Sequence, residues 1–255
     1  MTTVSTVTVV RNDLPGLTKT GLSLASQTCH DFEWVVIDGA STGLNKIAKD
    51  MLTPSPTTFI SEPDAGIYDA MNKGWKEASG DGVLFLNAGD TLCQDRTLAD
   101  VIPQLDHSER DWAFGMVRNV DNQGNVIGVQ NASPFNRMGH ALGNTTVPHQ
   151  ATFMRKGLLE RLGGFNPHIG TAADQELIYR AALQGPPLEL VWPVADFQLD
   201  GVGMQVSPSA HLSIMRKARS EHRDRFLGNP VTDSAATAAL YIKQAVAPRI
   251  TRLRG

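Results

Sequence analysis

Residues 62–74 read Glu-Pro-Asp-Ala-Gly-Ile-Tyr-Asp-Ala-Met-Asn-Lys-Gly, and residues 83–90 read Val-Leu-Phe-Leu-Asn-Ala-Gly-Asp. The apolar run 83–86 is bounded by turn residues, which predicts a buried strand. A carboxylate just past the carboxyl end of such a strand, here Asp90, lies where open α/β sheets bind their ligands. This stretch therefore predicts an α/β fold with a ligand site at the strand ends.

Strand and helix signals alternate through the first half of the chain. Strands are predicted at 4–10, 34–37, 57–60 and 83–86, with helices at 15–29, 44–52 and 68–78. This order predicts a mostly parallel sheet with helices on both faces. Later strands are expected at 112–120, 125–129 and 188–194, with helices at 157–162, 173–183, 213–226 and 235–247. We expect 213–226 to be a charged, exposed helix and 230–234 to be a linker.

Composition excludes several classes of protein. The chain has 255 residues, of which 41% are hydrophobic and 19% charged, as in a globular protein with a sizeable core. A net charge of −3 creates no field that would recruit nucleic acid. Residues 1–10 lack a positively charged signal region, and no apolar run approaches the roughly 18 residues that span a bilayer. We therefore expect a cytoplasmic protein, either free or resting on the inner face of the membrane.

The string from Asp64 to Gly74 closely resembles nucleotide-sugar-dependent glycosyltransferases of family 2, in the branch that builds surface polysaccharides and glycolipids. The resemblance spans about residues 4–200. It implies a GT-A-type α/β fold over residues 1–229, with a nucleotide-binding sheet and a smaller acceptor-side half, followed by a helix and basic tail at 230–255. It also implies inverting sugar transfer to a hydroxyl of a saccharide or lipid-linked acceptor, with UDP donors as the first expectation and GDP donors as the second.

Three residues at the ends of the first two predicted strands are candidates for the nucleoside pocket. Asp38 can accept hydrogen bonds from a base or ribose, and the small residues after it allow close backbone approach. In family 2 the matching aspartate contacts the nucleoside, and Thr8 and Asn12 match positions that line the same pocket. The alternative is that Asp38 forms a turn or caps a helix and that the other two are ordinary strand-end residues.

Residues 62–74 place four polar side chains on a turn and the start of a helix. By resemblance, Asp64 lines the nucleotide pocket, while Asp69 and Asn72 organise its wall. Lys73 could reach a phosphate, and backbone amides at the helix start could meet an anion. Because Asp69 and Lys73 are four residues apart on a helix, a surface ion pair is the alternative.

Asp90 is the candidate metal ligand. Metal-dependent relatives carry Asp-x-Asp or a variant here, and its last carboxylate holds the Mg²⁺ or Mn²⁺ ion that bridges the two phosphates. This chain has Asn87-Ala88-Gly89-Asp90, so Gly89 replaces the carboxylate commonly found just before the last one. The resemblance thus implies a divalent cation held by one protein carboxylate.

Asp174 is the candidate general base. It follows Gly163-Gly164-Phe165-Asn166 at the start of a predicted helix, an arrangement that again resembles family 2, in which this aspartate takes the acceptor's proton. Without the resemblance, Asp174 would be interpreted as a helix cap. Glu176 is the fallback base, although helix geometry should point it elsewhere.

Histidines and the basic C-terminus complete the candidates. His149 precedes Gln150, as in the relatives, which suggests a role on the acceptor or phosphate side; a structural histidine is the alternative. A late loop carrying His211, Arg216 and His222 could cover the diphosphate. The tail interleaves basic residues (Lys243, Arg249, Arg252, Arg254) with apolar ones, a pattern that could rest on an anionic membrane. Because Pro248 interrupts this segment, a frayed, solvated tail is the alternative.

Two rival functions can be weighed from the sequence. A nucleotide-sugar dehydrogenase or epimerase needs Gly-x-Gly-x-x-Gly after the first strand, but residues 11–16 read Arg-Asn-Asp-Leu-Pro-Gly. A degenerate transferase that only binds a nucleotide sugar or scaffolds a partner is supported by Gly89 alone. The four aspartates Asp38, Asp64, Asp90 and Asp174 favour an active enzyme.

Overall fold

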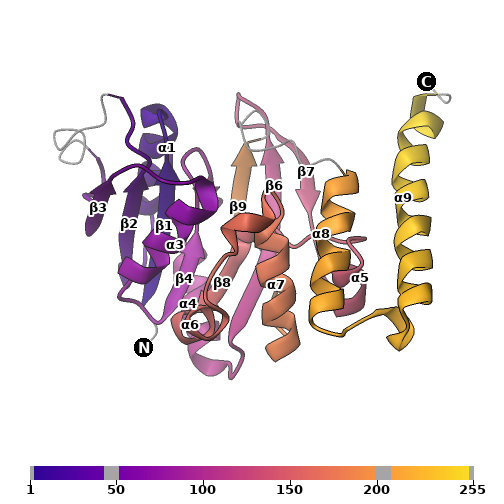
Figure 1. Cartoon of the computed structure of the whole chain (residues 1–255). Helices are drawn as coiled ribbons and strands as arrows, with labels where there is room; N and C mark the ends of the chain where they lie inside the picture. Colours follow the sequence, from indigo (N-terminus) through magenta and orange to yellow (C-terminus); the bar gives the residue numbers. More distant parts are fainter. Residues whose placement is uncertain (1–2, 43–51, 199–207, 253–255) are drawn as a thin grey trace.

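The computed structural model describes residues 3–42, 52–198 and 208–252, and it contains one mixed sheet flanked by helices (Figure 1). The first half of the sheet is parallel, in the order β3-β2-β1-β4. Its strands are β1 (Val4–Val10), β2 (Phe32–Asp38), β3 (Thr58–Ser61) and β4 (Gly82–Phe85). This half agrees with the strands predicted from the sequence, while the predicted helix 44–52 lies almost wholly outside the described residues.

The second half of the sheet is joined through β8 (Thr152–Arg155), which runs antiparallel to β4. Beyond it the order is β6-β9-β5, and β7 pairs with β6. These strands are β5 (Thr91–Leu92), β6 (Trp112–Val120), β7 (Val126–Gln130) and β9 (Leu188–Gln198). β6 and β9 are parallel, so the switch of direction is confined to β8 and to the short partners β5 and β7.

Helices bury both faces of the sheet. Alternating strand residues such as Val10 and Val36 pack against α1 (Leu14–Ala25) and α4 (Thr97–His107) on one face. Their neighbours Val9 and Ile37 face α3 (Ile67–Glu77), α6 (Lys156–Leu162) and α7 (Ala173–Gln184) on the other. The period-two alternation of β-strands thus produces two apolar layers, one on each side of the sheet.

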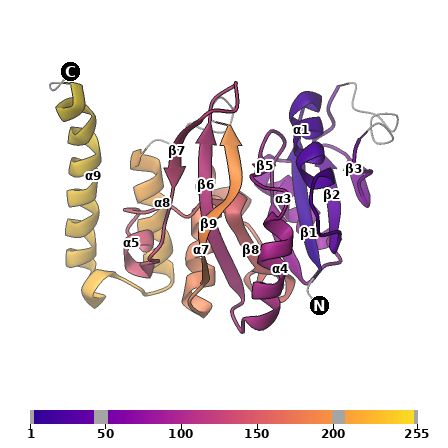
Figure 2. The same ribbon diagram turned by 180° about the vertical axis from the view of Figure 1, so that it is seen from behind.

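α8 (Pro208–Glu221) and α9 (Pro230–Arg252) lie beyond the sheet edge, next to α5 (Arg137–Ala141), in both ribbon views (Figures 1 and 2). The fully buried guanidinium of Arg219 donates to both carboxylate oxygens of Asp233, at 2.7 and 3.0 Å. Two expectations from the sequence are wrong here. The helix expected at 213–226 to be exposed corresponds to α8, which buries Leu212 and Met215. The segment 230–234 is not a linker, because α9 already begins at Pro230, and proline suits the first turn of a helix.

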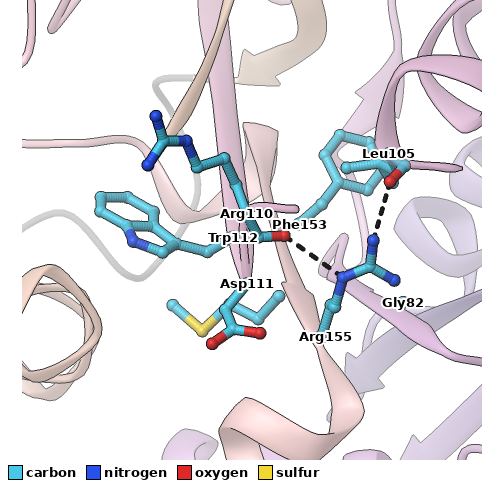
Figure 3. Close-up of a pocket in the computed structure, with 8 residues that line it drawn as sticks. Gly82, Leu105, Arg110, Asp111, Trp112, Phe153 and Arg155 are labelled. Carbon is cyan, nitrogen blue, oxygen red and sulfur yellow. Dashed lines mark hydrogen bonds between the residues drawn. The ribbon is translucent and has the colours of Figure 1, made fainter. Parts of the chain in front are cut away.

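The amino-terminal ends of β4 and β6 are closed by Arg155 (Figure 3). Its guanidinium donates to the carbonyl oxygens of Leu105, Ser108 and Arg110 at 2.8, 3.0 and 3.2 Å, which ties the end of β8 to the end of α4. The pocket beside it measures about 10 Å³, enough for a single water molecule at most. This end of the sheet is therefore structural, and the candidate site lies at the opposite end.

Candidate active site

A cleft of about 810 Å³ opens on the carboxyl-end side of β4. Its walls are the start of α3, the segment 143–150 and the segment 167–175, and Asn87, Gln130, Phe197 and His211 complete the lining. The volume falls in the range of small-molecule sites. Its position matches the strand ends at which the sequence predicts ligand binding.

Asp174, in the first turn of α7, lies on the cleft wall with its side chain 13% exposed. Its Oδ1 accepts a hydrogen bond from the Tyr68 hydroxyl at 3.1 Å. Its Oδ2 accepts one from Gln175 Nε2 at 2.8 Å and lies 3.3 Å from His149 Nδ1. Side chains from α3, from the 3-10 helix η1 (His149–Ala151) and from α7 thus converge on one carboxylate.

Opposing effects set the ionisation of Asp174. Burial raises the pKa of its carboxyl, but the hydrogen bond and charge of His149 and the hydrogen bonds of Gln175 together hold this pKa below its usual value. Burial and the Asp174 charge raise the pKa of Tyr68 well above its ordinary range. Asp174 is therefore ionised and Tyr68 is a neutral hydroxyl at physiological pH.

His149 links Asp174 to the strand end after β4. Its Nε2 lies 3.3 Å from Asn87 Nδ2, so the imidazole bridges the amide of Asn87 and the carboxylate of Asp174. Within the part of the chain that the structure describes, Asn87 Oδ1 is buried with no hydrogen-bond partner, and so is Nε2 of His211 on α8. Both residues line the cleft. Unpaired buried polar atoms are rare in folded proteins, so these two atoms are suited to contact a bound ligand.

The turn after β2 brings together three residues predicted to form the nucleotide pocket, Asp38, Asn12 and Asp64. Asp38 is fully buried, and it accepts hydrogen bonds from the hydroxyls of Ser41 (2.5 Å) and Ser61 (2.6 Å). Asn12 Oδ1 accepts from the backbone N–H of Thr42 at 2.9 Å. A Cβ built at Gly39 would lie only 2.3 Å from Asp64 Oδ2, so the Asp64 carboxylate approaches this turn closely. Asp38 and Asn12 therefore shape the turn, while Asp64 lies against it.

Thr8 has a different environment from the one that the resemblance implies. Its side chain is fully buried, and its hydroxyl accepts a hydrogen bond from the Trp34 indole at 2.9 Å. Thr8 lies on the face of the sheet that α1 and α4 cover, the same face as Val10. This placement argues against direct contact with a ligand and assigns Thr8 to the core.

α3 carries the remaining candidates of residues 62–74. Asp69 lines the cleft and accepts a hydrogen bond from the Ala65 N–H at 3.0 Å. Lys73 Nζ lies 2.8 Å from Glu62 and 3.8 Å from Asp69, and the Glu62 hydrogen bond raises its pKa. The ion-pair interpretation of Lys73 thus fits the structure, in which its ammonium also donates to the Pro63 carbonyl at 2.8 Å and holds the turn before α3.

Asn72 does not line the cleft but joins the two halves of the molecule. Its Nδ2 donates to the Phe165 carbonyl at 2.8 Å, and its Oδ1 accepts from the Phe165 N–H and the Trp75 indole, both at 2.9 Å. Gly164 has φ +69°, and a Cβ there would lie 2.4 Å from Asn72 Oδ1. The Gly-Gly-Phe turn that precedes Asp174 is therefore fixed to α3 through this amide.

Asp90 is buried, with 5% of its surface exposed, three residues beyond Asn87. Burial raises its pKa to about 7, and the charges of His149 and Lys19 offset this only in part. Among the described residues no three histidine, cysteine or acidic side chains cluster as a metal site. Gly89 has φ +96°, a conformation that side chains disfavour, which accounts for the missing neighbouring carboxylate. Asp90 is not among the residues that line the cleft, whereas Asn87 is; a carboxylate and an amide oxygen are ligand types that a hard cation prefers.

Other candidates lie away from the cleft. Glu176 pairs with Arg180 at 2.7 Å, so it is not available as a base. Arg216 donates to Ser234, and His222 packs against the Tyr179 ring, so of the three late residues only His211 reaches the cleft. Sequence reasoning assigned no role to Tyr68, Asn87 or Gln175, although all three stand in the stretches that carry the family resemblance.

The fold is that of a GT-A-type glycosyltransferase. Residues 5–163 match the model of glycosyl transferase family 2, and the chain belongs to this family. An uncharacterised glycosyltransferase of Mycobacterium tuberculosis is 36% identical over 225 residues, which cover 87% of this chain and 84% of that protein. A PGL/p-HBAD biosynthesis glycosyltransferase of Mycobacterium bovis is 33% identical over 168 residues, 62% of this chain and 61% of that protein.

Solved structures support the fold. TarS 1–349 of S. aureus in complex with UDP-GlcNAc matches with a TM-score of 0.69 at 21% identity, over 92% of this chain and 70% of that chain. The mannosyltransferase PcManGT of Pyrobaculum calidifontis in complex with GDP-Man and Mn²⁺ matches with a TM-score of 0.59 at 19% identity, over 96% and 80%. The family and the fold class predicted from the sequence are thus confirmed. None of the described helices is both long and apolar enough to cross a membrane.

Proposed function

We propose that this glycosyltransferase moves a sugar from a nucleoside-diphosphate sugar to a hydroxyl of a saccharide or lipid-linked acceptor, with inversion at the anomeric carbon. One observation carries the proposal. Asp174, a carboxylate held by three side chains, lies on the wall of the 810 Å³ cleft at the strand ends. A fixed, ionised carboxylate in a cleft suits proton abstraction from a hydroxyl.

Asp174 is the proposed general base. The acceptor oxygen attacks the anomeric carbon while its proton passes to Asp174. The bond from that carbon to the diphosphate oxygen breaks, and its electron pair leaves with the diphosphate. A single displacement of this kind inverts the anomeric carbon. The lowered pKa keeps the carboxylate ionised, and the charge of a bound diphosphate would raise its basicity.

The nucleoside is proposed to bind against the 38–42 turn and Asp64. Support comes from the approach of Asp64 to Gly39 and from Asp38 and Asn12, which order the turn. UDP is the first candidate and GDP the second, since the matched structures of TarS and PcManGT contain UDP-GlcNAc and GDP-Man, respectively. The cleft beside the start of α3 would then receive the diphosphate and the sugar.

Asp90, with Asn87, is proposed to hold Mn²⁺ or Mg²⁺. When bound, such a cation supplies positive charge that stabilises the departing diphosphate. The solved structure of PcManGT is a complex with GDP-Man and Mn²⁺, which supports a divalent ion in a protein of the same fold. His211 faces the same cleft with an unpaired nitrogen and is proposed to contact the bound donor.

The acceptor is proposed to enter between segments 143–150 and 167–175, on the side of Asp174. The relative named for PGL/p-HBAD biosynthesis supports an acceptor from surface-glycan or glycolipid synthesis. A lipid-linked acceptor would place the enzyme at the cytoplasmic face of a membrane, where the basic tail of residues 230–255 could contact anionic lipid.

The test is transfer assayed together with donor binding. Asp174→Asn should lower kcat about 100- to 10,000-fold, the usual contribution of a general base, while donor affinity measured by calorimetry stays within a few-fold of wild type. Near-normal turnover by Asp174→Asn would place the base elsewhere. Glu160→Gln serves as the matched control, because Glu160 is exposed on α6 and does not line the cleft.

A further inference from the structure

The Tyr68 hydroxyl has two hydrogen-bond acceptors at the same distance. Asp174 Oδ1 and the carbonyl oxygen of Thr171 both lie 3.1 Å from it. The ring is held in place independently of the hydroxyl, because it packs against the Phe165 ring with centroids 5.4 Å apart. A single hydroxyl proton can serve only one acceptor at a time, so this hydroxyl has two well-placed orientations.

The two oxygens of Asp174 are unequally occupied. Oδ2 meets two donors, Gln175 Nε2 and His149 Nδ1, which account for both of its lone pairs. Among the side chains of the described residues, only the Tyr68 hydroxyl donates to Oδ1, which leaves room on this oxygen for an incoming proton. An acceptor hydroxyl in the cleft therefore delivers its proton to Oδ1, the oxygen that Tyr68 holds.

We infer that Tyr68 is the positioning residue of the proposed base and acts as a reversible hydrogen-bond switch; this inference rests on the proposed role of Asp174. While Asp174 is ionised, the hydroxyl donates to Oδ1 and orients the carboxylate. When Oδ1 takes the acceptor's proton, the Tyr68 O–H turns to the Thr171 carbonyl, and its oxygen accepts from protonated Asp174. Tyr68 loses no proton, so the transfer is balanced between the acceptor and Asp174 alone.

The switch explains how a carboxylate held by several donors can still act as a base. A donor with only one acceptor would lose its hydrogen bond when the carboxylate is neutralised, and leaving a buried polar group unpaired is destabilising. The Thr171 carbonyl removes that cost for Tyr68. The other titratable groups near Asp174 are His149 on η1, His211 on α8 and His140 on α5. Burial lowers the pKa of both His140 and His211, so both imidazoles favour the neutral form. Of these titratable groups, Tyr68 and His149 contact the Asp174 carboxylate directly.

Tyr68→Phe tests the inference, because it removes the hydroxyl and keeps the ring against Phe165. We expect kcat to fall about 10- to 100-fold while donor affinity is unchanged. Loss of a donor to the charged form raises the pKa of Asp174, so the acidic limb of the kcat profile should move to higher pH. Tyr179→Phe is the matched control: its hydroxyl donates to Asp224 at 3.0 Å, outside the cleft, and its loss should leave kcat and the profile at wild-type values.

Unchanged kcat and an unchanged pH profile in Tyr68→Phe would overturn the inference, as would a loss of activity matched by an equal loss of donor affinity. Asp174→Asn in the same assay separates the two proposals. If Asp174→Asn is inactive and Tyr68→Phe behaves as wild type, only the switch fails. If Asp174→Asn is active, the base assignment fails, and the switch fails with it.

Discussion

Asn72→Ala tests whether the two halves of the molecule are held together through one amide. The substitution removes three hydrogen bonds, two to the Phe165 backbone and one to the Trp75 indole, and it leaves those groups without partners. At about 1 kcal/mol for each bond, the free energy of unfolding should fall by about 3 kcal/mol. Because Phe165 also packs on Tyr68, kcat should fall further than donor affinity does.

Chemical denaturation measures the stability change, and calorimetric titration of the donor separates binding from turnover. Asn166→Ala is the control in the same loop, since its side chain caps the short helix η2 (Pro167–Ile169) through a single exposed hydrogen bond from the His168 N–H and should cost about 1 kcal/mol. Equal stabilities for the two variants, or an Asn72→Ala protein with wild-type kcat, would refute the proposed link between α3 and the turn before Asp174.

Two further predictions concern buried charges. Asp90→Asn should abolish the Mn²⁺-dependent gain in nucleoside diphosphate affinity. With a chelator present, the variant should also become more stable than wild type as pH rises toward about 7. The reason is that burial raises the pKa of Asp90, so the wild-type protein loses stability as this carboxyl is forced to ionise in the folded state. Thermal melts across pH check this, and identical pH dependence in both proteins would contradict it. Asp233→Asn should cost about 3–5 kcal/mol near neutral pH by leaving buried Arg219 unpaired. Burial raises the pKa of Asp233, but its hydrogen bonds with Arg219 outweigh burial and hold this pKa below its usual value. The stability advantage of wild type over Asp233→Asn should therefore shrink in acid, as the carboxyl protonates. A stability difference that stays constant with pH would argue against the ion pair.

The parallel half of the fold could be predicted from the sequence because its signals are local. Each of β1 to β4 is a short apolar run, and parallel order follows from the alternation with helices. The pairing of β8 between β4 and β6 could not, because antiparallel partners far apart in sequence leave no local signal. α4 was also missed: Pro103 argues against a helix interior, but burial of the Leu98, Val101 and Ile102 face outweighs it.

The candidate site divides in the same way. The resemblance to family 2 pointed to Asp174, Asp64 and Asp90 as candidates, because each stands in a recognisable string. It could not tell that Thr8 and Asn72 contact other parts of the protein, since that depends on which way each side chain points in the fold. Nor could it place Tyr68 beside Asp174, since 106 residues separate them in the chain. Contacts of this kind arise only once the two halves pack together.

The most direct test of the central claim is calorimetric titration of the folded protein with UDP, GDP and their sugars, with and without Mn²⁺. A nucleotide-sugar transferase should bind one nucleotide series selectively and more tightly with Mn²⁺. Asp64→Ala should weaken that binding, and Asp174→Asn should keep it. Absence of binding across the panel by a demonstrably folded sample would contradict the claim and favour a scaffold that has lost its donor site.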